Sequence, residues 1–348
     1  MEKEEIFERI NKSKRPLFFF DDDCDGCCSY LLLKRFFKKG TGIILKSAKV
    51  DESNLKKIQE IKPDLVIILD KPIVMQEFID NCSAPIIWID HHPILERENI
   101  LYYNPRKFNL EVIPCTTRIV YDLVKNKEDL WIAFIGCISD YDMPDFIEDY
   151  RKKYFELIEN KEELEDIIFN TKTGNLILIV NFVLKGITSD VKRCISILEK
   201  IESPIEIINA TTPRGKYLLN KGIKLQKEYN KLKEIALQTK IEDNMLIFIY
   251  PSTKNSYSSE LSTEVRYILK NKFIIIGRRK EDEVVMSLRS NHCKIPLFLE
   301  KALNGVKGYG GGHDNACGAV VSINDFNLFI ENLKIEYKNF LKDNKNII

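Results

Sequence analysis

The first half of the chain alternates short apolar runs with segments of helical pattern, and this alternation limits the fold more than any other feature. The runs are almost entirely aliphatic or aromatic, as strands buried on both faces are. They cover residues 17–20, 43–45, 65–69 and 86–89, with a helical pattern at 26–37. Strands that alternate with helices predict a parallel sheet with right-handed crossovers. Ligands of such sheets bind at the carboxyl ends of the strands.

The rest of the chain divides into a helical stretch and a second α/β segment. Helical patterns cover 115–124, 129–139 and most of 144–240, where Leu225, Tyr229, Leu232 and Ala236 form one apolar stripe. After that we expect strands at 246–250, 273–276, 284–288 and 319–323, helices at 258–269 and 296–303, a glycine loop near 308–312 and a closing helix. The predicted parts are 1–145, a parallel-sheet domain; 146–240, a helical connector; and 241–348, a smaller α/β domain.

Composition indicates a soluble protein inside the cell. The 348 residues suit two domains, and 53 basic against 52 acidic residues give a net charge of +1, which neither supports nor excludes a polyanionic partner. No apolar signal core opens the chain, and the longest apolar stretch, 176–187, is interrupted and too short for a bilayer. We therefore expect a cytoplasmic protein without a membrane partner.

Cysteine usage adds little. Nine cysteines without a secretory signal predict reduced thiols. Cys24 and Cys27 form one C-x-x-C, but with no second pair at metal spacing, buried packing is favoured over a zinc or redox site.

Four aspartates crowd the end of the first predicted strand. Asp21, Asp22, Asp23 and Asp25 are followed by Gly26, which allows a tight turn into a helix. Neighbouring carboxylates repel by roughly 4 kcal/mol per pair at an effective dielectric near 20. A solvated acidic turn would tolerate this repulsion, but the alternation of the aspartates suits a hard divalent cation.

Further acidic residues and the histidines support the cation. Asp70 and Asp90 each follow an apolar run, and Asp140 follows the helical pattern at 129–139. A single aspartate there is usually a helix cap, but several at one sheet edge favour a metal site. All four histidines also lie beside candidate motifs: His91, His92, His292 and His313. Of these, His292 is the weakest candidate.

These motifs resemble the DHH phosphoesterase superfamily. The matching positions are Asp21 to Gly26, then Asp70, then Asp90-His91-His92, then Asp140. Residues 310–318, Gly-Gly-Gly-His-Asp-Asn-Ala-Cys-Gly, resemble the glycine–histidine signature of its usual partner domain, DHHA1. The resemblance covers nearly the whole chain, with the motifs in the family's order.

The resemblance implies two cations per site, Mn²⁺ or alternatively Mg²⁺. Asp23 would ligate one cation and Asp25 the other, with Asp70 between them and with His91 and Asp140 completing the second site. A bridging water would act as the nucleophile.

The remaining motif residues would support these ligands or the substrate. Asp21 would assist the first metal, His92 would face the substrate phosphate, and Asp90 would orient the histidines. Asp22 has no required role, and Asp142 is the alternative in the fourth motif.

In the second α/β segment the resemblance implies substrate binding. Gly311, Gly312 and His313 would bring backbone amides and an imidazole to a phosphate or terminal nucleotide. Arg289 would contact a phosphate. Tyr309 could stack on a base or pack in the core, and residues 278–280 are expected in a basic hairpin turn.

The function implied is hydrolysis of single-stranded DNA or RNA by a RecJ-like exonuclease. Because 348 residues leave no room for an added OB-fold, short oligonucleotides are attractive substrates. The alternatives are a nano-RNase, pAp phosphatase or cyclic-dinucleotide phosphodiesterase, and a replisome scaffold. Replication or repair proteins are candidate partners, and a homodimer is compatible with the sequence.

Overall fold

The computed structural model describes residues 2–108, 111, 113–252 and 255–343. The chain divides into two compact units, Met1–Ile223 and Lys224–Ile348. None of the described helices combines the length and the apolar character that a membrane span requires.

A parallel five-stranded sheet forms the centre of the first unit. Its strands are β1 (Pro16–Asp21), β2 (Thr41–Leu45), β4 (Leu65–Leu69), β6 (Ile86–Ile89) and β7 (Leu101–Tyr103), in the order β2-β1-β4-β6-β7. All neighbouring pairs are parallel, so the carboxyl ends lie at one edge. The predicted α/β fold is confirmed, and two of the strands have the predicted bounds. A two-stranded ribbon pairs β3 (Lys49–Val50) with β5 (Ile73–Val74).

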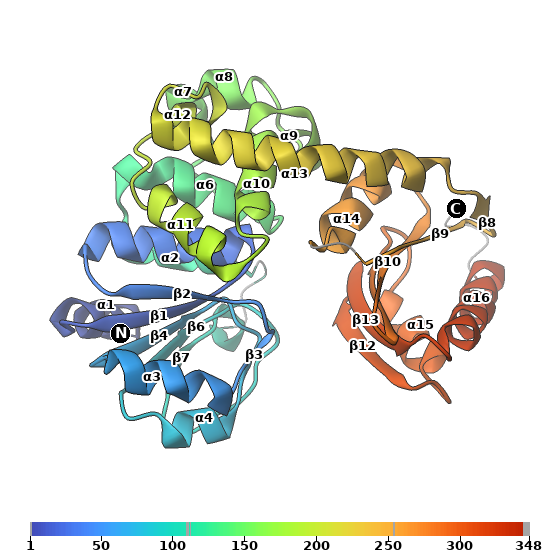
Figure 1. The fold of residues 1–348 in the computed structure, drawn as a ribbon, viewed down its shortest axis with the longest axis horizontal. Helices are drawn as coiled ribbons and strands as arrows, with labels where there is room; N and C mark the ends of the chain where they lie inside the picture. The colour runs from blue at the N-terminus through green and yellow to red at the C-terminus, as the bar shows by residue number, and fades with distance from the viewer. Residues whose placement is uncertain (1, 109–110, 112, 253–254, 344–348) are drawn as a thin grey trace. The chain divides into compact units, whose positions relative to one another are not determined.

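Helices cover both faces of this sheet (Figure 1). One face carries Phe18 and Phe20 and packs in one core with α1 (Glu2–Lys12), α2 (Cys24–Phe37), α5 (Thr116–Val124) and α6 (Leu130–Ser139). The opposite face carries Phe19 and packs with α3 (Leu55–Ile61) and α4 (Gln76–Asn81). Successive strand residues point to opposite faces, so strands built entirely of apolar residues fill both cores.

The stretch after the sheet is helical, as predicted. It contains α7 (Ile147–Lys153), α8 (Phe155–Ile158), α9 (Leu164–Asn170), α10 (Lys172–Val183), α11 (Thr188–Leu198), α12 (Pro204–Ile208) and α13 (Pro213–Gln238). Tyr229 and Ala236 of the predicted stripe are buried on α13. The division between the units falls inside this helix.

The second unit contains a mixed six-stranded sheet. Its strands are β8 (Ile241–Glu242), β9 (Met245–Tyr250), β10 (Phe273–Lys280), β11 (Glu283–Arg289), β12 (Gly308–His313) and β13 (Ala316–Ser322), in the order β12-β13-β11-β10-β9-β8. Only β9 and β10 run parallel. The helices are α14 (Ser258–Ile268), α15 (Ile295–Ala302) and α16 (Phe326–Asp343), of which α15 and α16 share a core with one face of the sheet.

Two expectations for this unit are wrong. The glycine segment forms strand β12 at the edge of the sheet, not a loop, because its backbone pairs along its length with β13. Residues 278–280 lie in β10, and the hairpin turns at Glu281 and Asp282, between the pair Lys280 and Glu283. The turn needs only two residues, so the strands extend beyond their apolar parts.

Candidate metal centre

The carboxyl ends of β1, β4 and β6 bring the predicted acidic residues together. Asp23 caps α2, and its carboxylate accepts a hydrogen bond of 2.9 Å from the backbone nitrogen of Gly26. A Cβ atom at Gly26 would lie 2.7 Å from the backbone nitrogen of Asp21. Glycine is therefore required for the first turn of α2 to lie against the end of β1.

Asp25 is buried in the first turn of α2 and is held by the start of α5. Its carboxylate accepts hydrogen bonds from the backbone nitrogens of Thr116 at 3.0 Å and Thr117 at 2.7 Å. The Thr117 hydroxyl donates to the backbone carbonyl of Asp25 at 2.9 Å. A helix N-terminus carries partial positive charge, so α5 stabilises the carboxylate and fixes its orientation.

Asp70 follows β4 and has a backbone φ of 57°, in the left-handed region. This conformation is uncommon for residues other than glycine, and strain of this kind concentrates at functional sites. The carboxylate is buried and accepts a hydrogen bond of 3.1 Å from the Thr116 hydroxyl. The same oxygen lies 3.4 Å from Nε2 of His91.

The segment after β6 places both histidine rings against carboxylates. His91 Nδ1 lies 3.5 Å from Asp140, at the end of α6. His92 Nδ1 lies 2.7 Å from the fully buried Asp90. The backbone nitrogen of His92 donates to the other Asp90 oxygen at 3.1 Å. Asp90 therefore fixes the orientation of the His92 ring.

The side chains form three overlapping groups whose potential ligand atoms lie within 4.8 Å of one another. The groups are Asp21, Asp23 and Asp70; Asp25, His91 and Asp140; and Asp70, His91 and His92. Asp70 and His91 each belong to two groups. The structure thus brings together every metal ligand that the sequence nominated in the first unit.

Burial and the charges within the cluster shift the pKa values of its members. Burial raises the pKa of Asp21 to about 6 and has the same effect on Asp140, whose pKa is also raised to about 6. Burial and the charge of Asp70 also raise the pKa of Asp25 well above its usual range. Ionising all of these carboxylates is unfavourable, because their negative charges lie close together. A bound cation would offset this repulsion.

Asp70 and His91 shift in opposite directions as an ion pair. Burial alone would raise the pKa of Asp70, but its hydrogen bond with His91 and the histidine charges lower it to about 2. Burial alone would lower the pKa of His91, but Asp70 and Asp140 raise it to about 10. His91 is therefore the positive partner of Asp70 within the cluster.

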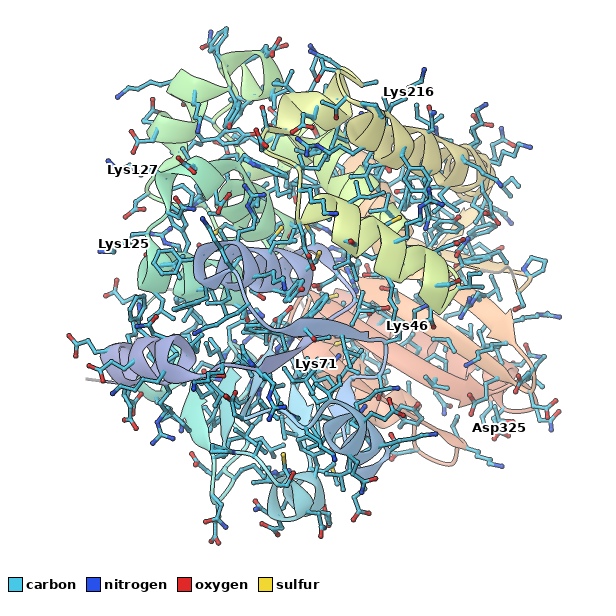
Figure 2. All side chains as sticks on the ribbon, turned by 60° about the vertical axis from the view of Figure 1, so that its left-hand side comes forward. Lys46, Lys71, Lys125, Lys127, Lys216 and Asp325 are labelled. Atoms are coloured by element: carbon cyan, nitrogen blue, oxygen red, sulfur yellow. The ribbon has the colours of Figure 1, made fainter. Side chains whose placement is uncertain are left out.

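Sequence reasoning missed Lys71, which lies next to Asp70 in the chain. Its side chain is fully buried, and Nζ lies 2.7 Å from the Asp21 carboxylate. It also missed Thr116 and Thr117, which donate hydrogen bonds to Asp25 and, from Thr116, to Asp70. The predicted helix at 115–124 does begin at this point of the chain, as α5. Lys71 is labelled in Figure 2, as is Lys46, which follows β2.

The alternative fourth-motif residue, Asp142, lies in a different group. It is near the buried thiols of Cys115 and Cys137, and its carboxylate accepts a hydrogen bond of 3.0 Å from the Cys115 backbone nitrogen. Cys24 and Cys27 are buried free thiols, as the packing interpretation predicts.

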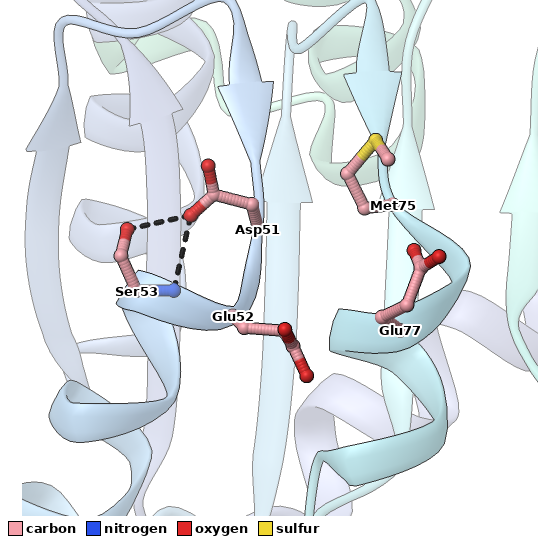
Figure 3. Close-up of a pocket in the computed structure, with 5 residues that line it drawn as sticks. All are labelled: Asp51, Glu52, Ser53, Met75 and Glu77. Atoms are coloured by element: carbon pink, nitrogen blue, oxygen red, sulfur yellow. Dashed lines mark hydrogen bonds between the residues drawn. The ribbon is translucent and has the colours of Figure 1, made fainter.

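A pocket of about 420 Å³ in the first unit has no part in the centre. It is lined by Asp51, Glu52, Ser53, Met75 and Glu77. The Asp51 carboxylate is turned to Ser53, where it accepts a backbone hydrogen bond of 3.0 Å (Figure 3). Three acidic side chains would repel a phosphate, so we assign no substrate to this pocket.

Three of the four nominated residues of the second unit, Arg289, Gly311 and His313, lie on one face of its sheet. Arg289 and His313 both pair in register with Ala316, from opposite sides of β13, and Gly311 pairs with Gly318. Paired residues of antiparallel strands share a face. A Cβ at Gly311 would have no atom within 4 Å, so packing does not explain this glycine.

Gly312 is required by the conformation of the backbone. Its φ is 149°, and a Cβ there would lie 2.4 Å from the carbonyl oxygen of Ala316. Tyr309, on the same face as Gly311, is 70% exposed, which excludes the core-packing alternative. His292 contacts the Tyr337 hydroxyl at 2.7 Å through Nε2, as expected of a structural residue.

Comparison with known families gives two matches. The model of the DHH family N-terminal domain matches residues 17–141, and the DHHA1 domain model matches residues 242–339. No curated protein sequence matches the chain.

Several solved structures share the fold. RecJ from Thermus thermophilus in complex with Mn²⁺ is 14% identical with a TM-score of 0.69, over 97% of this chain and 54% of RecJ. This chain therefore spans about half of that protein. A manganese-bound exonuclease RecJ is 14% identical with a TM-score of 0.64, over 96% of this chain and 93% of that one. The pGpG-specific phosphodiesterase PggH from Vibrio cholerae is 15% identical with a TM-score of 0.50, over 94% of this chain and 99% of PggH.

Proposed function

Because the chain belongs to the DHH/DHHA1 superfamily, we propose that it is a two-metal phosphodiesterase acting on single-stranded nucleic acid or short oligonucleotides. The observation that carries this proposal is the set of three overlapping ligand groups, in which Asp70 and His91 are each shared. Shared ligands are what two adjacent cations require.

The donor set fits hard divalent cations. Carboxylate oxygens and imidazole nitrogens make up all three groups, with no thiolate among them. Such ligands favour Mn²⁺ or Mg²⁺ over Zn²⁺. Asp21, Asp23 and Asp70 would hold one cation, and Asp25, His91 and Asp140 the other, with Asp70 between them.

The chain's own residues would orient the reaction. Bound cations would supply Lewis acidity to the phosphate and lower the pKa of a water nucleophile. The α5 amides keep Asp25 in place. Burial alone would lower the pKa of His92, but its hydrogen bond to Asp90 and the Asp90 and Asp70 charges raise that pKa. A protonated His92 would donate a hydrogen bond to a phosphate oxygen.

The face of Arg289, His313 and Gly311 in the second unit would bind the substrate. Arg289 Nε donates to the Thr263 hydroxyl at 3.2 Å and Nη1 to the Leu288 carbonyl at 2.9 Å. These contacts fix the plane of the guanidinium, which would pair with a phosphate. Gly311 of β12 and its partner Gly318 of β13 have no side chains, so a nucleotide could approach the backbone at this pair. The exposed Tyr309 could stack on its base.

Two substrate classes remain to be separated. The aspartate spacing of the first motif resembles RecJ exonucleases and favours single-stranded polymers. The likeness to PggH over almost all of that chain favours small dinucleotides, within the nano-RNase, pAp-phosphatase and cyclic-dinucleotide alternative. We place short single-stranded oligonucleotides first.

The scaffold alternative and the partners stay predictions. Loss of ligands would favour a scaffold, but every nominated metal ligand is present, with its ligand atom within 4.8 Å of those of its group. Replication or repair proteins and a second copy of the chain remain candidate partners.

One assay tests the proposal. The purified chain with Mn²⁺ is given labelled single-stranded DNA, RNA, RNAs of two to five nucleotides, pAp and cyclic dinucleotides in parallel. We expect the short single strands to be cleaved fastest. Preference for pAp or cyclic dinucleotides would select the alternative, and no cleavage of any substrate would contradict the phosphodiesterase.

Matched variants connect the activity with the site. Asp25→Asn and His91→Ala should abolish cleavage, whereas Asp22→Asn, which removes a neighbouring carboxylate outside the three groups, should retain it. Equal activity of Asp25→Asn and Asp22→Asn would reject the assigned centre.

A further inference from the structure

The ammonium group of Lys71 is fully buried and contacts Asp21, a member of one of the ligand groups. Its Nζ donates to the Asp21 carboxylate at 2.7 Å and to the backbone carbonyl of Leu45, at the end of β2, at 3.2 Å. A charge removed from water in this way is stable only when it is paired and hydrogen-bonded. Asp21 supplies the charge partner.

The position of Lys71 is set by the ends of the strands. It directly follows Asp70, whose left-handed backbone turns the chain. The indole of the buried Trp88 donates to the Lys71 carbonyl at 2.9 Å. The backbone of Lys71 is therefore fixed beside the turn that presents the Asp70 carboxylate, and its ammonium is held by Asp21 and the Leu45 carbonyl.

The two proposed cation sites are therefore neutralised by different means. The Asp25 carboxylate is stabilised by the amide dipoles of α5, and the imidazole of His91 in the same group is itself a proposed ligand, whose nitrogen a bound cation would occupy. The ammonium of Lys71, in contrast, is not a ligand and would stay beside a bound cation. The Asp21–Asp23–Asp70 group has a full positive charge in contact with one of its members. The amide dipoles of α5 would still stabilise the Asp25 carboxylate when a cation is bound to it. The Lys71 ammonium, in contrast, would repel a cation that binds the Asp21 carboxylate.

We infer that Lys71 is a built-in counter-cation that holds the Asp21–Asp23–Asp70 group together without metal and lowers the affinity of this group for its divalent cation. The inference rests on the proposed metal binding. It follows that the Asp25–His91–Asp140 group fills first and that the group beside Lys71 fills second. Lys71 acts through Asp21 and is a positioning residue.

The test is a titration of the full-length chain with Mn²⁺ alone at one fixed pH, followed by electron paramagnetic resonance and calorimetry. Wild type should show one tighter and one weaker Mn²⁺. In Lys71→Met the weaker Mn²⁺ should bind more tightly, on the order of tenfold. The metal-free melting temperature should fall in this variant, and the rise caused by Mn²⁺ should be larger than in wild type.

Lys46→Met is the matched control. Lys46 follows β2 at the same edge of the sheet, but its Nζ donates to the carbonyl of Gly186 at 2.7 Å in an exposed contact. Its removal should leave both Mn²⁺ affinities close to wild type. An unchanged or lower affinity for the weaker Mn²⁺ in Lys71→Met would overturn the inference, as would an equal change in Lys46→Met.

Folding of the variant does not decide the outcome. If Lys71→Met folds only with Mn²⁺, that dependence is itself the expected result. If it folds under neither condition, Lys71→Gln, which keeps a donor for the Leu45 carbonyl, gives the same comparison. Because the readout is Mn²⁺ binding, absent hydrolysis would reject the proposed activity alone, and unchanged Mn²⁺ affinities would reject the role of Lys71 alone.

Discussion

Asp70 is the carboxylate that both cations of the proposed centre would share. It belongs to two ligand groups and holds a left-handed backbone. Asparagine tolerates this conformation, so Asp70→Asn removes the charge with little backbone strain. We expect hydrolysis to fall by more than the roughly 100-fold typical of a residue that only supports a ligand, with weaker binding of both Mn²⁺ ions in a titration.

Asp22→Asn is the control for that experiment, because Asp22 belongs to none of the three groups. Two Mn²⁺ ions bound with wild-type affinity in Asp70→Asn would show that Asp70 does not join the two sites.

Asp90 should behave differently, because it contacts His92 without belonging to a ligand group. Asp90→Asn keeps the shape of the side chain but weakens its hold on the His92 ring. Activity should fall by roughly 10–100-fold, while the number of bound Mn²⁺ ions stays at the wild-type value. Loss of a Mn²⁺ ion would instead assign Asp90 to the metal.

Single residues were predictable where each ended an apolar run or belonged to a motif. Asp70 and Asp90 directly follow β4 and β6, so the strand pattern itself placed them at one edge. Lys71 was not predictable in this way, because its partner Asp21 lies 50 positions earlier in the chain. Only the folded sheet shows that β1 and β4 are neighbours.

Among the elements, helix α12 depends on a charged cap. Glu206 accepts hydrogen bonds from the backbone nitrogen of Glu202 at 2.7 Å, from the Thr212 hydroxyl at 2.7 Å and from Arg214 Nε at 2.8 Å. Burial opposes ionisation, but these donors lower the pKa of Glu206 to about 2. The carboxylate form is therefore favoured by folding.

The sign of the resulting pH dependence follows from that lowered pKa. The stabilisation by Glu206 is complete above the ordinary glutamate pKa of 4.5 and is lost as the pH falls from there to about 2. Glu206→Gln should lower the free energy of unfolding at neutral pH, on the order of 2 kcal/mol, and should flatten its dependence on pH in this window. Urea unfolding followed by tryptophan fluorescence measures it, because both tryptophans, Trp88 and Trp131, lie in the first unit.

Glu8→Gln provides the comparison. Glu8 pairs with Lys12 on the exposed surface of α1, where ion pairs contribute little. An acid dependence in Glu206→Gln as steep as that of wild type and of Glu8→Gln would contradict the assignment.

The glycine strand shows why one element could not be predicted. Glycine is depleted in strands, so a run of glycines favours a loop. Here Gly308, Gly310 and Gly312 meet neighbouring atoms closely, and a Cβ at Gly308 would lie 2.5 Å from the Val320 carbonyl oxygen. Pairing with β13 at the edge of the sheet requires these glycines, and that pairing is a tertiary property.

For the whole molecule, we expect metal binding and substrate binding to be separable by mutation, because their residues lie in different units. Arg289→Lys keeps the charge but loses the planar guanidinium. We expect KM for a short oligonucleotide to rise roughly tenfold, with kcat and Mn²⁺ binding little changed. Steady-state kinetics and an Mn²⁺ titration of the same preparation measure this.

Arg279→Lys is the control, since Arg279 is exposed on β10 near the hairpin. A fall in kcat without a change in KM for Arg289→Lys would place Arg289 in the chemistry and not in substrate binding.

The fold class and the family could be predicted from the sequence because apolar runs and motifs are local signals. The partition into residues 1–145, 146–240 and 241–348 stays a prediction. In the structure, the compact units meet between Ile223 and Lys224, inside α13. A helix that continues from one core to another carries no turn or composition change that would mark such a boundary.

Helix α13 also determines how this protein could be recombined with its relatives. Gly222 packs against Ile179 of the first unit, whereas the Tyr229 hydroxyl donates to the Glu264 carboxylate and Lys233 Nζ lies 2.8 Å from Glu264 in the second. A chimera joined after residue 240 would take Tyr229 and Lys233 from one parent and Glu264 from the other. A crossover between Ile223 and Lys224, inside the helix, would keep each of these contacts within one parent, so we expect modules to be exchanged best at a junction within a single helix.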